Sequence, residues 1–119
     1  MITLSIGTFF KRILAGTAFN RYRQVFDMAG YAIMLIDNTT NHFIKANRAA
    51  SELFGYTEDE LQNMTPLDLS TDTGEGITHP GQKAEESVIR SARRKDGKII
   101  TIKVHTSYLD RFRISLISD

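Results

Sequence analysis

The chain has 119 residues, of which 41% are hydrophobic and 24% are charged, and its formal net charge is +1. These values are typical of one ordinary globular domain, and a charge so close to zero gives no overall attraction to nucleic acid or to anionic lipid. The sequence contains no cysteine, which excludes disulfides, thiolate metal ligands and cysteine nucleophiles. This composition fits a reducing, cytoplasmic location.

The N-terminal segment, residues 1–20, is the most apolar stretch. Lys11 and Arg12 interrupt it, so it is too short to cross a membrane as a helix. Four large apolar residues in it recur at helical spacing and share one helix face: Ile2, Ile6, Phe9 and Ile13. This face packs either on the chain's own domain or on a partner chain. Because a group of exposed apolar side chains usually marks an interface, we expect a homodimer through this face.

Short elements follow in chain order. Residues 31–37 form an apolar run of strand length, and after a polar turn residues 42–46 form a return strand. Asn47 is a suitable N-cap for a helix over 48–54, and Gly55 is placed to end it.

Two more helical turns are expected before a loop. Thr57 and Glu60 have the spacing of a capping box, which starts another short helix. Residues 64–69 add a further apolar turn, and the glycine-rich segment 70–82 is expected to be a loop.

The second half is a strand region. Residues 87–94 form a strand that ends near Asp96-Gly97, a pair that favours a tight hairpin. Residues 99–108 and 111–118 then alternate in polarity with period two, with Phe112, Ile114 and Leu116 on one face. The order predicts an α+β fold, a five-stranded antiparallel sheet with short helices on one face and an N-terminal flanking helix.

The stretch 43–61, F-I-K-A-N-R-A-A-S-E-L-F-G-Y-T-E-D-E-L, resembles the signature of the PAS, or sensory-box, family. Asp37 after the first strand and the turn R-R-K-D-G at 93–97 also resemble that family, and Ser118-Asp119 resembles the start of its closing motif. The resemblance covers residues 21–119, which we take as the PAS domain, with residues 1–20 as its flank. It implies a sheet in which the first two strands lie at one side and the last strand is central.

The resemblance implies a sensory input module of a larger protein in two-component or cyclic-nucleotide signalling. Such a module is not an enzyme; it binds a small ligand or a partner and relays the event to an effector domain, expected after Asp119. One alternative is a PAS scaffold that only dimerises and holds no ligand. Another is a small enzyme on a similar curved sheet, which would need His105 or Asp37 facing an apolar cavity.

A small cavity is expected where the apolar faces of helices and strands meet. The residues expected to line it are Leu35, Leu53, Phe54, Met64, Leu69, Ile102 and Ile114, with His105 as the polar candidate. The family's usual helix after a His-Pro pair such as His79-Pro80 has room here for at most one turn, so a large enclosed pocket is not expected.

No cofactor or metal is expected. A light-oxygen-voltage flavin sensor needs a cysteine for its adduct, and the sequence has neither cysteine nor tryptophan. Haem needs an axial ligand, and the family's haem histidine would lie on the shortened helix. The basic residues around 90–98 are expected to form a solvated hairpin tip, with no nucleic-acid partner.

Overall fold

The computed structural model describes residues 21–71 and 86–119. Residues 21–28 are helical. The strands and helices that follow are β1 (Ala32–Asp37), β2 (Phe43–Ala46), α2 (Arg48–Phe54), α3 (Glu58–Gln62), α4 (Pro66–Leu69), β3 (Glu86–Arg93), β4 (Ile99–Leu109) and β5 (Phe112–Ser118).

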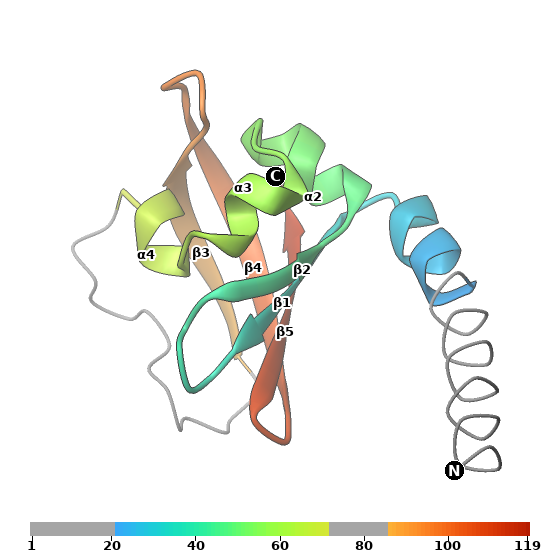
Figure 1. Cartoon of the computed structure of the whole chain (residues 1–119). Helices are drawn as coiled ribbons and strands as arrows, with labels where there is room; N and C mark the ends of the chain where they lie inside the picture. The colour runs from blue at the N-terminus through green and yellow to red at the C-terminus, as the bar shows by residue number, and fades with distance from the viewer. Residues whose placement is uncertain (1–20, 72–85) are drawn as a thin grey trace, which may run out of the picture.

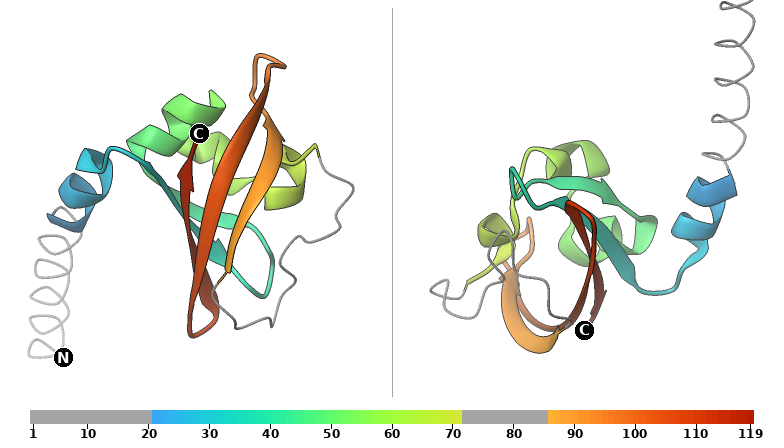
Figure 2. Two further views of the ribbon diagram at one scale, coloured as in Figure 1. Left: turned by 180° about the vertical axis from the view of Figure 1, so that it is seen from behind. Right: turned by 90° about the horizontal axis from the view of Figure 1, so that it is seen from below.

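The five strands form one antiparallel sheet in the order β2-β1-β5-β4-β3. The predicted fold class is confirmed, with the first hairpin at one side and the last strand in the centre. Helices α2, α3 and α4 cover one face of the twisted sheet (Figure 1). The helix of residues 21–28 lies to the side of the sheet, near α2 and away from α4 (Figure 2).

The core lies between the sheet and these three helices. Alternate residues of β1 are buried on its inner face, namely Ala32, Met34 and Ile36. Each helix adds one large buried side chain: Phe54 from α2, Leu61 from α3 and Leu69 from α4. Burying an apolar side chain of this size stabilises the fold by about 1.5–3 kcal/mol, so these contacts hold the helices on the sheet.

Asn47 joins three elements through one fully buried side chain (0% exposed). Its Oδ1 accepts hydrogen bonds from the backbone N–H of Ile33 in β1 and of Ala50 in α2, at 2.9 and 3.0 Å. Its Nδ2 donates to the carbonyls of Phe26 and Tyr31, at 2.9 and 3.0 Å. The amide therefore caps α2, anchors α2 to β1 and holds the end of the helix of residues 21–28.

The local signals that mark the ends of helices and turns are confirmed. Asn47 is the N-cap of α2, and Gly55 ends the helix at a φ of 82°, which favours glycine. Thr57 and Glu60 form the predicted capping box of α3. Gly97 takes a φ of 89° in the turn between β3 and β4.

The tip of the β3–β4 hairpin contacts helices α2 and α3. Arg94 Nη1 donates to the carbonyl of Leu53 at 2.7 Å, and the N–H of Lys95 donates to the carbonyl of Phe54 at 2.8 Å. The Lys95 ammonium pairs with Glu60 Oε2 at 2.7 Å. Arg94 is therefore less solvated than expected, because its Nη1 meets a carbonyl at the end of α2. The Lys95 side chain stays exposed, as the expectation of a solvated tip requires.

Several predictions lie outside the described residues. These are the apolar helix face of Ile2, Ile6, Phe9 and Ile13, and most of the loop 70–82 with its shortened helix.

Removing the Asn47 side chain should destabilise the domain more than removing an exposed cap. Asn47→Ala leaves two N–H groups and two carbonyls without their partner. The bonds to the Ala50 N–H and the Phe26 carbonyl are buried, and each buried group left unpaired costs about 1–3 kcal/mol. We expect a loss of roughly 3 kcal/mol or more in the free energy of unfolding, against about 1 kcal/mol for Thr57→Ala, measured by urea denaturation. Asn47→Ser, which keeps only the cap acceptor, should fall between them. Equal losses for Asn47→Ala and Thr57→Ala would contradict this assignment.

The Lys95–Glu60 contact should be visible as a lowered carboxyl pKa. The hydrogen bond from Lys95 lowers the pKa of Glu60 from its ordinary value. The contribution of the contact is therefore present above the ordinary glutamate pKa of about 4.3 and is lost as the pH falls through the lower, folded-state pKa. Lys95→Met should raise the pKa of Glu60 in a carboxyl ¹³C NMR titration. Arg93→Met removes an exposed charge from the same hairpin, and an equal rise there would show that net charge, not the contact, is responsible.

Candidate functional site

A small cavity of about 90 Å³ lies between the helices and the inner face of the sheet. Its walls are mostly apolar and come from both layers. The sheet contributes Met34, Ile36, Ala92, Ile102 and Ile117, and Phe54 and Leu69 come from α2 and α4. A ligand in this cavity would therefore touch both layers at once.

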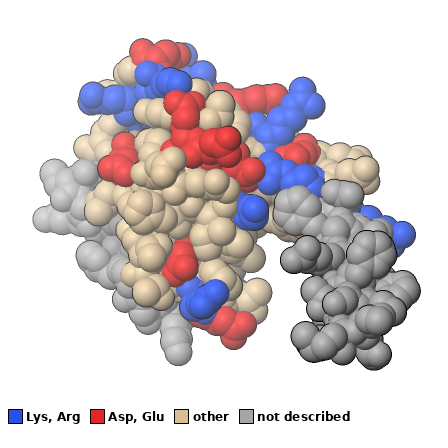
Figure 3. All heavy atoms as spheres, viewed as in Figure 1, with Lys and Arg blue, Asp and Glu red and all other residues tan. Residues whose placement is uncertain are grey.

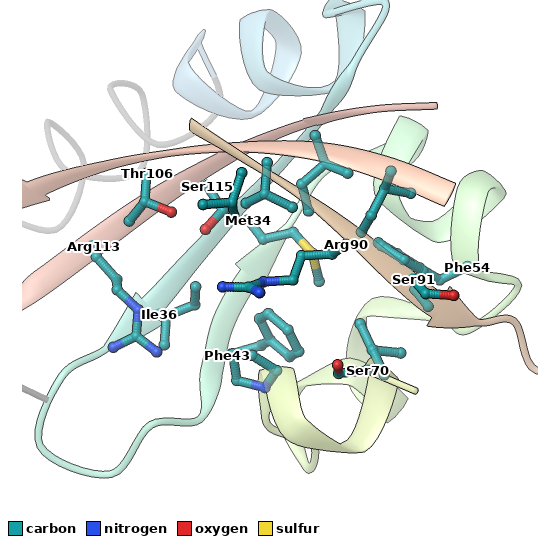
Figure 4. Close-up of a pocket in the computed structure, with 17 residues that line it drawn as sticks. Met34, Ile36, Phe43, Phe54, Ser70, Arg90, Ser91, Thr106, Arg113 and Ser115 are labelled. Atoms are coloured by element: carbon teal, nitrogen blue, oxygen red, sulfur yellow. The ribbon is translucent and has the colours of Figure 1, made fainter. Parts of the chain in front are cut away.

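Polar side chains also reach the cavity (Figure 4). Arg113 and Ser115 come from the central strand β5, Thr106 from β4, and Arg90 from the edge strand β3. The Arg113 side chain is buried (2% exposed), and it donates to the side-chain oxygens of Asn38 and Asn41. Desolvation by burial lowers the pKa of Arg113 from its ordinary value.

The structure brings three of the eight sequence-predicted site residues to this cavity: Phe54, Leu69 and Ile102. Leu53 and Met64 are partly buried and pack against the core without lining the cavity. Leu35 and Ile114 pair with each other across β1 and β5 on the opposite face of the sheet. Whether any of these residues contacts a ligand stays a prediction.

The placement of Ile114 differs from the expectation because of strand parity. Side chains alternate between the two faces of a strand, and an apolar set normally faces the core. In β5 the residues that face the helices are Arg113, Ser115 and Ile117, and the apolar set on the other face is only half-buried. The signal that could have found Arg113 is a lone arginine between Phe112 and Ile114 in an alternating strand.

His105 lies on the outer face of the sheet, away from the cavity. It pairs across β4 and β5 with Leu116, and its Nδ1 shares a hydrogen bond of 2.7 Å with Ser87 Oγ. Together with Tyr31 and Lys103 these residues border an open hollow on that face. His105 therefore has no direct access to the inner cavity.

A second polar network links the helix of residues 21–28 to the helices over the sheet. Arg23 Nη1 contacts Glu58 Oε2 at 2.8 Å, and its Nε contacts Asp27 at 2.9 Å. The same Glu58 oxygen accepts the N–H of Ala46 in β2 at 2.9 Å. Hydrogen bonding to Glu58 raises the pKa of Arg23 above its ordinary value, so the contact favours the charged form of Arg23.

The described residues show no other site of recognisable chemistry. They contain no group of three or more side chains arranged to hold a metal ion, and no helix among them has the length and apolar character needed to cross a membrane. On the face seen in Figure 3, acidic and basic side chains lie side by side over the hairpin and helices, without a large area of one sign.

Comparison with known proteins identifies the family to which this fold belongs. A family model described as a PAS domain matches residues 20–91, more than half of the chain, and the chain belongs to that family. No curated protein matches the chain.

Solved structures with the same fold are distant in sequence. A domain of a sensory box sensor histidine kinase/response regulator from Geobacter sulfurreducens has a TM-score of 0.74 at 23% identity, covering 86% of this chain and 94% of that one. A PAS domain from a two-component sensor histidine kinase has a TM-score of 0.74 at 19% identity, covering 87% and 97%. The LOV domain of a blue-light activated histidine kinase from Erythrobacter litoralis has a TM-score of 0.64 at 16% identity, covering 76% and 96%.

Proposed function

We propose that this PAS domain is a non-catalytic input module, in which a small molecule in the inner cavity alters how the helices sit on the sheet. The observation that carries the proposal is the double attachment of the helix of residues 21–28. Asn47 holds its end through Phe26 and Tyr31, and Arg23 bridges it to Glu58 of α3. The attachment points belong to or adjoin α2 and α3, and Phe54 of α2 lines the cavity.

The size of the cavity supports a small ligand. A volume of about 90 Å³ is well below the roughly 300–1,000 Å³ of pockets that hold drug-sized molecules and cofactors. We therefore propose that neither haem nor flavin is the ligand.

The proposed output is an effector domain on the same polypeptide. Support comes from the three related structures described above, all of which are domains of histidine kinases by their descriptions. We also propose that the domain acts in the cytoplasm, in two-component or cyclic-nucleotide signalling.

Filling the cavity by mutation should loosen the helix of residues 21–28. Ala92 is buried (1% exposed) and lines the cavity from β3, so Ala92→Leu adds three carbon atoms that push on the helices opposite. This displacement should weaken the hydrogen bonds from Asn47 to the carbonyls of Phe26 and Tyr31. We therefore expect amide exchange of residues 21–28, measured by hydrogen–deuterium exchange, to become several-fold faster.

The matched control is Arg93→Leu, at the exposed neighbouring position of the same strand. Exchange in β5, measured alongside, separates a local response from global destabilisation. Unchanged exchange of residues 21–28 in Ala92→Leu, or the same change in Arg93→Leu, would count against the proposed relay.

A ligand-free dimerisation module is the alternative, and one surface favours it. Tyr22, Val25 and Met28 lie three residues apart on one helix face and are 42%, 71% and 81% exposed. The predicted interface of Ile2, Ile6, Phe9 and Ile13 lies outside the described residues and stays a prediction. We include a homodimer in the proposal on the ground of the exposed helix face.

Sedimentation of the full chain at micromolar concentration tests the homodimer. We expect a dimer that dissociates in Val25→Glu/Met28→Glu, because two buried charges would face the partner. Gln24→Glu, which adds the same charge at an exposed polar position of the same helix, should remain dimeric. A monomer in the unmodified chain, or a dimer that survives both the double substitution and deletion of residues 1–18, would exclude this interface.

A further inference from the structure

Two arginine side chains extend into the same small cavity. Arg113 enters from the central strand β5, and Arg90 enters from the edge strand β3 and reaches over Phe43 (Figure 4). Arg90 is half-buried, whereas Arg113 is buried. Arginine is rare in a fully buried position unless a partner or a ligand meets its charge.

The charge of Arg113 is not neutralised by any acidic side chain in the described part of the chain. Its hydrogen bonds go to the side-chain amide oxygens of Asn38 and Asn41, which are neutral acceptors. None of the ion pairs formed by residues 21–71 and 86–119 includes it. A guanidinium buried among apolar walls without a counter-charge is costly, so a negative ligand would be strongly favoured beside it.

Hydroxyl groups lie next to Arg113 on the same face of the sheet. Ser115 and Thr106 are paired across β5 and β4, and both are buried. Tyr108 is paired with Arg113, and its hydroxyl is buried without a hydrogen-bond partner among the described residues. Hydroxyl donors and a guanidinium fork together suit an oxyanion.

We propose that the inner cavity binds a short-chain carboxylate, with its carboxylate group on Arg113 and its apolar tail against Met34, Phe43 and Ile102. The inference rests on the proposed sensory function and specifies its ligand. The guanidinium would bind the negative group, and the apolar walls would pack against a hydrocarbon tail. The cavity volume of about 90 Å³ limits the ligand to a few heavy atoms.

Sodium butyrate is the probe, and its neutral isostere butyramide is the matched control. The ¹⁵N-labelled full chain is titrated with each at constant ionic strength, and binding is followed by the Nε–Hε signal of Arg113 and by the melting temperature. We expect a saturable shift of the Arg113 signal and a rise in melting temperature with butyrate only. Sodium chloride and inorganic phosphate should produce neither.

Three substitutions test the residues. Arg113→Gln should weaken butyrate binding by at least about tenfold, because it removes a charged hydrogen-bond donor. Arg90→Gln should also weaken it, which keeps the test decisive if Arg113→Gln fails to fold. Arg93→Gln, on the exposed side of the same hairpin, should leave binding unchanged. A triple variant, Asp72→Asn/Glu75→Gln/Glu85→Gln, should bind butyrate as the unmodified chain does.

Four results would overturn the inference. They are equal binding of butyramide, equal binding of phosphate, no saturable effect of butyrate, and binding that appears only in the triple variant, which would mean that the chain supplies its own counter-anion. Binding of butyramide would leave the proposed sensory function intact, since a neutral ligand would then occupy the cavity. The hydrogen–deuterium exchange measured for Ala92→Leu tests the proposed sensory function separately, because that experiment requires no ligand.

Discussion

The side chain of Asn47 sets the position of the helices over the sheet. An amide offers two N–H donors and an acceptor oxygen with two lone pairs, and Asn47 uses both donors and both acceptor sites, towards Phe26, Tyr31, Ile33 and Ala50. Serine or aspartate would cap α2 as well, but neither could donate to the two carbonyls. Because the group is fully buried, water cannot replace a lost partner. The place of α2, and with it one wall of the cavity, therefore depends on this one amide.

The two faces of strand β5 have an unusual division of polarity. In β5 the face towards the helices carries Arg113 and Ser115, and the outer face carries Ile114 and Leu116. A strand that served packing alone would have the reverse arrangement. The polar groups on the inner face do not maximise stability, and they lie where a ligand would meet them. Stability is supplied around them by Met34, Phe54 and Leu61, which are almost completely buried.

Local signals in the sequence predicted the fold well, and they predicted the site only in part. The caps at Asn47 and Thr57 and the turn at Gly97 depend on neighbouring residues, so a single sequence contains the information. The other hydrogen bonds of Asn47 reach the carbonyls of Phe26 and Tyr31, which lie far from it in the sequence. No local sequence pattern predicts these bonds. The facing of β5 was inferred from its apolar set, which is the wrong criterion for a strand that borders a polar cavity. Arg113 was missed for that reason.

The sheet order also determines when the domain can form. Strand β1 lies between β2 and β5, so its second neighbour is the last strand of the described chain. A nascent chain that has not yet released β5 can form only the β1–β2 and β3–β4 hairpins, and an isolated hairpin is marginally stable at best. The long chain segment between β1 and β5 must be closed into a loop before most of the stabilising contacts form, and this slows folding. The cavity therefore comes into existence in one late step, when β5 enters between the two hairpins and brings Arg113 with it.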